Sequence, residues 1–288
     1  MNLFDRLSRE ALRNAPDLGA LLPVVEKELL HHDILRELSA YGVLAGLTFM
    51  GGTCLRACYG SVRLSEDLDF YGGTTFRREQ LDGFPGHLER VLFEKYGLEV
   101  QVKEPKPTPG HVETWKVSII TRPERSDLPV QRIHLDICAL PSHDPKPMVL
   151  RNPYGVELGT TGLIVRAASR EEILADKFVA LALRRGRIKF RDLWDIQWLV
   201  QSAITLRSGL ALEKAGQYGL RPHDFAGRLA ARLRELEEDA KLPSGFLSEL
   251  QRFLPVNQVR GRIDQPAYWE YLVAMLQEQA RPLLKQSR

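Results

Sequence analysis

The sequence predicts an α+β fold in which a domain of mixed sheet and helices is followed by a domain of helices alone. Strand-like and helix-like segments alternate up to residue 140, and almost every segment after residue 169 has helical periodicity. The composition changes between these two points, and elements segregated along the chain are typical of α+β proteins. We therefore place the first domain at residues 1–165 and the helical domain at residues 166–288.

The first domain is predicted to begin with a helix and a buried strand. Apolar residues recur at helical spacing over 22–41, where His31 and His32 are expected to form a surface pair. The apolar segment 43–50 ends at a Gly-Gly pair, which is typical of a buried strand that leaves through a turn. Thr53 is predicted to cap a short helix that follows this turn.

The remaining elements of this domain alternate between strand and helix. Strict alternation of polar and apolar residues over 67–70 favours a second strand, and a helix is expected near 77–95. Proline-rich segments at 104–111 and 141–147 are predicted to be loops. Three further strands are predicted at 98–103, 112–121 and 132–140.

The helical domain is predicted from four amphipathic segments. Helical spacing places Lys177 and Arg184 on one face of the first of them, and Asp192 and Asp195 on one face of the second. The predicted helices span 170–185, 191–201, 222–238 and 266–284.

The composition of the 288 residues excludes several protein classes. With 44% hydrophobic and 27% charged residues, the chain is neither fibrous nor wholly disordered. Three cysteines do not make a disulfide framework, and Cys54 and Cys58 lack the second ligand pair of a structural zinc site, so we expect them in the core. The N-terminus has no apolar secretory segment, and glycines interrupt the uncharged run 38–55. We expect a cytoplasmic protein with no membrane partner.

The net charge of +3 is unevenly distributed along the chain. Residues 1–150 carry 18 Lys and Arg against 21 Asp and Glu, a net charge of −3. Residues 151–288 carry 22 against 16, a net charge of +6. An acidic first part suits metal binding, and a basic second part suits a polyanion.

Asp67 and Asp69 give the strongest chemical signal. They lie two residues apart on a predicted strand, so both side chains leave the same face. Neighbouring carboxylates repel each other, and a divalent cation relieves that repulsion. Oxygen ligands suit Mg²⁺, or Mn²⁺ as the alternative. Asp136 would complete a set of three carboxylates if its strand runs beside the first.

Gly51 and Gly52 point to phosphate binding. A strand, a Gly-Gly turn and a helix start together bring backbone N–H groups close to phosphate oxygens. The chain has no GxxxxGK[ST] and no GxGxxG motif, so a P-loop is excluded and a dinucleotide-binding fold is unsupported.

The segment from Gly51 to Phe70 contains GGTxLR followed by RxSxDxDF. This pattern resembles the AbiEii-type nucleotidyltransferase toxins, which include the mycobacterial MenT proteins and belong to the DNA polymerase β-like nucleotidyltransferase superfamily. Lys177 resembles the family's helical lysine, and RDLWD at 191–195 resembles a later motif. The resemblance implies a polymerase-β-like nucleotidyltransferase domain with a mixed sheet, followed by a helical C-terminal domain.

The resemblance also implies roles for single residues. Either Asp192 or Asp195 would be the family's downstream acid, with Asp192 favoured, and the other would be structural, for instance as a pair between Asp192 and Arg191. Lys177 would contact the triphosphate. The implied nucleotide-binding residues are Gly51, Gly52, Thr53, Arg63 and Ser65. The implied catalytic residues are Asp67, Asp69, Asp136, Lys177, Asp192 and Asp195, of which the first three would be the metal ligands.

A basic run around residue 187 is the candidate contact to a nucleic-acid backbone. It holds five basic residues in eight, with Phe190 among them. The alternative is a solvated helix end. The proposed RNA-binding residues are Arg184, Arg185, Arg187 and Lys189.

Together these observations predict a metal-dependent nucleotidyltransferase. By resemblance it is the toxin of a toxin–antitoxin pair, with an NTP, a cognate antitoxin and a tRNA as partners, and it transfers NMP to the tRNA 3′ end with release of pyrophosphate. Two alternatives stay open. The acceptor could be a small molecule or a protein side chain, or the chain could bind a nucleotide or antitoxin without turnover.

Overall fold

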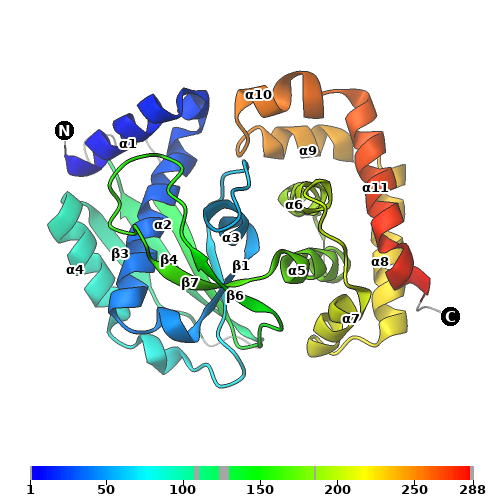
Figure 1. The fold of residues 1–288 in the computed structure, drawn as a ribbon, viewed down its shortest axis with the longest axis horizontal. Coiled ribbons are helices and arrows are strands. Elements are labelled where there is room, and N and C mark those ends of the chain that lie inside the picture. The colour runs from blue at the N-terminus through cyan, green and yellow to red at the C-terminus, as the bar shows by residue number, and fades with distance from the viewer. Residues whose placement is uncertain (1, 107–109, 123–129, 185, 286–288) are drawn as a thin grey trace. The chain divides into compact units, whose positions relative to one another are not determined.

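The computed structural model describes residues 2–106, 110–122, 130–184 and 186–285. Contacts within the chain divide it into two compact units, Met1–Ala168 and Ser169–Arg288. The strands of the described residues all lie in the first unit, and the second unit is built from helices (Figure 1). The α+β fold class predicted from the sequence is therefore confirmed.

A seven-stranded mixed sheet forms the centre of the first unit. Its strands are β1 (Thr48–Met50), β2 (Leu68–Tyr71), β3 (Glu99–Lys103), β4 (Val112–Ile120), β5 (Gln131–Cys138), β6 (Pro145–Val149) and β7 (Ile164–Ala168). They lie in the order β3-β4-β5-β2-β1-β7-β6. The pairs β2/β5 and β1/β7 are parallel and the other neighbouring pairs are antiparallel.

Helices pack against this sheet and against each other. Helix α2 contacts β5, α4 contacts β3, and α3 contacts both β1 and β2. The helices of this unit are α1 (Leu3–Asn14), α2 (Leu22–Ala40), α3 (Gly51–Ala57) and α4 (Phe84–Tyr96), with 3-10 helices at Pro16–Leu21, Leu44–Gly46 and Arg78–Leu81.

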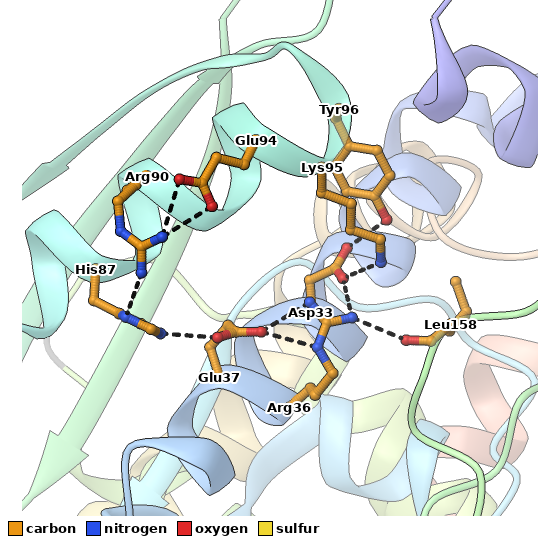
Figure 2. A network of polar contacts seen from close by, with 9 residues as sticks. All are labelled: Asp33, Arg36, Glu37, His87, Arg90, Glu94, Lys95, Tyr96 and Leu158. Carbon is orange, nitrogen blue, oxygen red and sulfur yellow. Dashed lines mark hydrogen bonds and ion pairs between the residues drawn. The ribbon is translucent and has the colours of Figure 1, made fainter.

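Charged side chains join α2 to α4, as Figure 2 shows. Lys95 Nζ lies 2.6 Å from Asp33 Oδ1, and His87 Nε2 lies 2.8 Å from Glu37 Oε2. Arg36 of α2 contacts both of these carboxylates. Because Asp33 and Glu37 are buried, these partners offset the cost of removing the two charges from water.

Three of the segments predicted for this unit differ in the structure. The strand predicted over 43–50 is shorter, because Leu44–Gly46 forms a 3-10 helix before β1. The helix predicted near 77–95 is divided by Gly83, which has a φ of +79°. The segment 141–147, predicted as a loop, contains the start of β6. This strand lies at the sheet edge, where the missing N–H of proline leaves no partner unpaired.

The second unit is a group of helices around α5. Ser169 caps this helix, since its hydroxyl accepts the N–H of Glu172 at 3.1 Å. Helix α5 packs against α6, α7 and α8, and α11 packs against α6 and α8. No helix of the described residues is long and apolar enough to cross a membrane. The helices are α5 (Arg170–Leu183), α6 (Phe190–Gln201), α7 (Ser208–Gln217), α8 (Pro222–Glu238), α9 (Leu242–Leu250), α10 (Val256–Gln258) and α11 (Pro266–Leu284).

Candidate active site

The predicted acids lie on two neighbouring strands at the centre of the sheet. The register of β2 and β5 places Asp69 directly beside Asp136. Met50 on β1 and Thr114 on β4 continue this row on either side. Neighbouring strands are about 4.8 Å apart, and residues in register present their side chains on the same face. The strand of Asp136 thus runs beside that of Asp69, which was the condition for a set of three carboxylates.

The opposite face of these strands is apolar and fixes their register. Leu68 and Phe70 on β2 alternate with Asp69, and both are buried. Leu135 and Ile137 on β5 lie in register with them and are also buried. A shift of one residue would expose these side chains and bury the acids, so the apolar face determines where the acids lie.

Asp67 lies one residue before β2 and contacts His134 of β5. Its Oδ1 accepts the backbone N–H of His134 at 3.1 Å and lies 3.0 Å from His134 Nδ1. His134 precedes Asp136 by two residues and so shares its face of the strand. Asp67 and Asp69 therefore both lie on the side of the sheet that carries Asp136. His134 was not among the predicted site residues, although its spacing from Asp136 is visible in the sequence.

The Gly-Gly turn packs directly against the residues of the second motif. Gly51 has a φ of +76°, and a β-carbon there would lie 2.5 Å from Asp69 Oδ2. A β-carbon at Gly52 would collide with the guanidinium of Arg63 and lie 3.2 Å from Ser65 Oγ. The absence of side chains at both glycines thus allows the GGT and RxSxDxD motifs to come together.

Thr53 does not cap α3, so that prediction was wrong. The helix begins at Gly51, with Met50 at the N-cap position and no side-chain cap. The positive φ of Gly51 lets the chain turn from β1 into the helix directly. The Thr53 hydroxyl instead donates to the backbone carbonyl of Asp67. Thr53 therefore anchors the start of β2.

The carboxylates provide a donor set that suits a hard cation. Within the described parts of the chain, no three His, Cys, Asp or Glu side chains converge closely enough to hold a metal ion. The donors of Asp67, Asp69 and Asp136 are all oxygen, and two of these residues are direct neighbours across the sheet. Such donors fit Mg²⁺ or Mn²⁺, which take a few carboxylate oxygens and fill other positions with water or phosphate.

In the second unit, Lys177 binds both acids of the later motif. Its Nζ lies 2.7 Å from Asp192 Oδ1 and 2.7 Å from Asp195 Oδ2. Arg184 Nη2 lies 3.0 Å from the other oxygen of Asp192. Burial raises the pKa of Asp192, but the charges of Lys177 and of the nearby Lys189 and Arg184 outweigh burial, so its pKa lies below the ordinary value.

The family model for the nucleotidyl transferase AbiEii toxin of type IV toxin–antitoxin systems matches residues 33–274. This chain belongs to the AbiEii family. It is accordingly a nucleotidyltransferase of a toxin family. A search of curated proteins gave no match.

Solved structures resemble this AbiEii-family chain in fold. MenT4, a nucleotidyltransferase toxin from Mycobacterium tuberculosis H37Rv, is 17% identical with a TM-score of 0.50, and the match covers 97% of each chain. JHP933 from Helicobacter pylori is 21% identical with a TM-score of 0.49, and the match covers 91% of this chain and 94% of that one.

Arginines of the basic run of this AbiEii-family chain form ion pairs, and Arg187 stays largely exposed in its pair. Arg187 is 76% exposed and lies 2.9 Å from Glu249, whereas Arg184 is bound to Asp192. Lys189 is half-buried, and Arg185 lies outside the described residues.

The aromatic and the arginine at the end of this run have structural contacts. Phe190 is 4% exposed and packs against Phe246 with ring centroids 6.0 Å apart. It therefore offers no exposed ring to a nucleic-acid base. Arg191 lies against Glu249 at 3.5 Å and over the ring of Phe253, while Asp192 is bound by Lys177.

The two histidines of α2 are buried, so the predicted surface pair was wrong. His31 is 2% exposed and His32 is 4% exposed. His31 Nε2 lies 3.0 Å from the carbonyl of Glu66, and His32 Nδ1 lies 2.7 Å from the hydroxyl of Thr160. Burial lowers the pKa of both rings, that of His32 to about 4. Cys54 and Cys58 are buried in the core, as predicted.

Proposed function

We propose that this AbiEii-family chain is a metal-dependent nucleotidyltransferase toxin that transfers NMP from an NTP to the 3′ end of a tRNA and releases pyrophosphate. One observation carries the proposal: Asp69 lies beside Asp136 on adjacent parallel strands, with the Gly-Gly turn packed on Asp69. Carboxylates next to a turn that can approach phosphate closely suit a nucleotide bound together with a divalent cation.

In this proposal Asp67, Asp69 and Asp136 hold Mg²⁺ or Mn²⁺. When bound, this cation would neutralise phosphate charge and increase the acidity of the acceptor hydroxyl. The acceptor oxygen forms a bond to the α-phosphorus of the NTP. The bond from that phosphorus to the oxygen bridging to the β-phosphate breaks, pyrophosphate leaves, and the hydroxyl proton is released to water.

The nucleotide phosphates are proposed to bind along the Gly51–Gly52 turn. Gly51 is partly exposed and has no side chain of its own that would hold a phosphate away from the backbone. Arg63 and Ser65 lie against Gly52 and supply a cation and a hydroxyl beside the turn. Thr53 contributes by anchoring Asp67. From the family resemblance, Lys177 is proposed to contact the triphosphate, and Asp192 or Asp195 to be the downstream acid.

A tRNA acceptor is supported by the charge of the chain beyond residue 150. That part has a net charge of +6, and Arg187 is largely exposed within the basic run. Exposed arginines contact phosphate oxygens of nucleic acid without reading its sequence. The family's type IV toxin–antitoxin description adds an antitoxin as the partner that neutralises the activity.

The experiment is to incubate the chain with each α-labelled NTP, Mg²⁺ and total RNA, and to compare it with Asp67→Asn. We expect label on tRNA with one or more NTPs, and at least about a hundredfold less with Asp67→Asn. Transfer at the same rate by Asp67→Asn would contradict the mechanism. Label on protein or on a small molecule would contradict the tRNA acceptor and support the alternative acceptors.

A further inference from the structure

Side chains of α2 hold the segment that leads into Asp67. Glu28 Oε1 accepts the backbone N–H of Ser65 at 2.8 Å. One turn further along the helix, His31 Nε2 lies 3.0 Å from the carbonyl of Glu66. Lys27 Nζ lies 2.6 Å from the side-chain carboxylate of the same Glu66. Consecutive residues of the segment are thus bound from one helix.

Glu28 is the centre of these contacts. It is 4% exposed, and its second oxygen accepts hydrogen bonds from Arg56 Nε at 3.1 Å and from the hydroxyl of Tyr154. Burial, followed by the charge of Glu28, raises the pKa of Tyr154, so the phenol stays protonated as a donor. A buried carboxylate with three donors is held in one position, because losing any of them is costly.

Two residues of α3 hold the segment at both of its ends. Arg56 Nη1 donates to the carbonyl of Ser61 at 3.0 Å, and Thr53 donates to the carbonyl of Asp67. Between them, Glu28 sets the position of Ser65, whose hydroxyl lies next to Gly52. Arg56 also balances the negative charge of Glu28, so Glu28 does not repel an anion at the turn.

We propose that Glu28 is a positioning residue for nucleotide binding, because it holds the Ser65 hydroxyl against the Gly51–Gly52 turn where the triphosphate binds. The inference rests on the proposed function. Glu28 precedes the residues that the family model matches, which begin at residue 33. It acts through Ser65 and has no contact of its own with the nucleotide.

Glu28→Gln tests this inference with little change in shape. In this variant the side-chain amide oxygen can accept from Arg56 and Tyr154. The amide NH₂ then faces the backbone N–H of Ser65, and two donors repel each other. Binding of each NTP with Mg²⁺ to the full chain is measured by isothermal titration calorimetry. We expect the affinity to fall about tenfold.

Glu37→Gln is the matched control. Glu37 lies on the same helix, is 7% exposed and is also paired, but its partners are His87 of α4 and Arg36. We expect both variants to lower the melting temperature, and the control to bind the NTP within about twofold of the wild type. Equal affinity of Glu28→Gln and Glu37→Gln would overturn the inference.

Ser65→Ala separates positioning from general stabilisation. This substitution removes the hydroxyl and keeps the N–H that Glu28 binds. If Glu28 acts through the hydroxyl, Glu28→Gln lowers the affinity about tenfold in the wild type but less than about twofold in Ser65→Ala. Additive losses in the double variant would overturn the inference.

Glu28→Asp replaces Glu28→Gln if that variant does not fold. If Glu28→Gln does not fold, Glu28→Asp retains the charge opposite Arg56 but withdraws it from Ser65, and we expect faster hydrogen exchange at Ser65 together with weaker NTP binding. Unchanged exchange and affinity would overturn the inference. A wild-type chain that binds no NTP would overturn the proposed function itself, and the inference with it.

Discussion

At the scale of single residues, Gly51 combines a φ of +76° with close approach to Asp69 Oδ2. Gly51→Ala adds backbone strain and pushes the carboxylate out of its place beside Asp136. We expect a loss of at least about 1 kcal/mol in the free energy of unfolding, and a loss of nucleotide transfer. Chemical denaturation and labelled transfer measure the two effects separately.

Gly73→Ala is the control for this prediction. Gly73 has a φ of +78°, and a β-carbon there would have no neighbour within 4 Å. We expect the same order of destabilisation with transfer near the wild-type rate. Equal loss of transfer in both variants would mean that strain alone, and not the position of Asp69, explains the effect.

Lys177 is expected to stabilise the second unit whatever its role in the reaction. It neutralises Asp192 and Asp195, which are both buried, so Lys177→Met leaves carboxylates without that cation. We expect the free energy of unfolding to fall by about 3 kcal/mol. Lys146→Met removes an exposed partner of Asp144, and we expect less than about 1 kcal/mol from it. Similar losses in denaturant titrations would contradict this account of Lys177.

Residue positions along the chain could predict only part of the site. The pair Asp67/Asp69 was visible because strand alternation is a local property. Glu28 was not, because its partner Ser65 is separated from it by the whole of β1 and α3, and no local spacing joins them. His31 was predicted to lie on the surface for the same reason, because its partner Glu66 becomes a neighbour only in the folded chain.

At the scale of elements, the contact between α2 and α4 predicts a dependence of stability on pH. Burial raises the pKa of Glu37, but hydrogen bonds from His87 and Arg36 outweigh burial, so its pKa lies below the ordinary value. A carboxylate with a lowered pKa contributes stability above its ordinary pKa, and this is lost as the pH falls through the lowered value. We expect the melting temperature of Glu37→Gln to fall less steeply than that of the wild type as the pH is lowered. An equally steep fall in both proteins would contradict a lowered pKa of Glu37.

Periodicity predicted most of the long helices and several of the strands, but it missed other elements. The predicted helices at 222–238 and 266–284 coincide with α8 and α11, and the helix predicted over 170–185 ends two residues early, at Leu183. Helix α1 and strand β7 were not predicted. Strand β7 has five residues and is defined by pairing in parallel with the distant β1, so its signal is tertiary.

At the scale of the whole molecule, the charge of the chain predicts salt-dependent RNA binding. Exposed basic residues release counterions from RNA when they bind, so affinity falls as salt rises. We expect Arg187→Ala to weaken tRNA binding and to reduce the slope of log affinity against log salt by up to about 1.

Arg221→Ala is the control for this prediction. Arg221 is 82% exposed and paired with Asp224, and it lies outside the basic run. We expect this variant to keep the wild-type slope. If the slope of log affinity against log salt is the same for wild type, Arg187→Ala and Arg221→Ala, Arg187 does not contact RNA.

The most direct test of the proposed reaction is the rate of pyrophosphate release from an NTP in the presence of total RNA, measured against Mg²⁺ concentration. Asp69→Asn is compared with Asp144→Asn, whose carboxylate pairs with Lys146. We predict that release needs Mg²⁺ in the wild type, falls at least about a hundredfold in Asp69→Asn, and stays near the wild-type rate in Asp144→Asn. Release by Asp69→Asn at the wild-type rate, with the same Mg²⁺ dependence, would contradict the account.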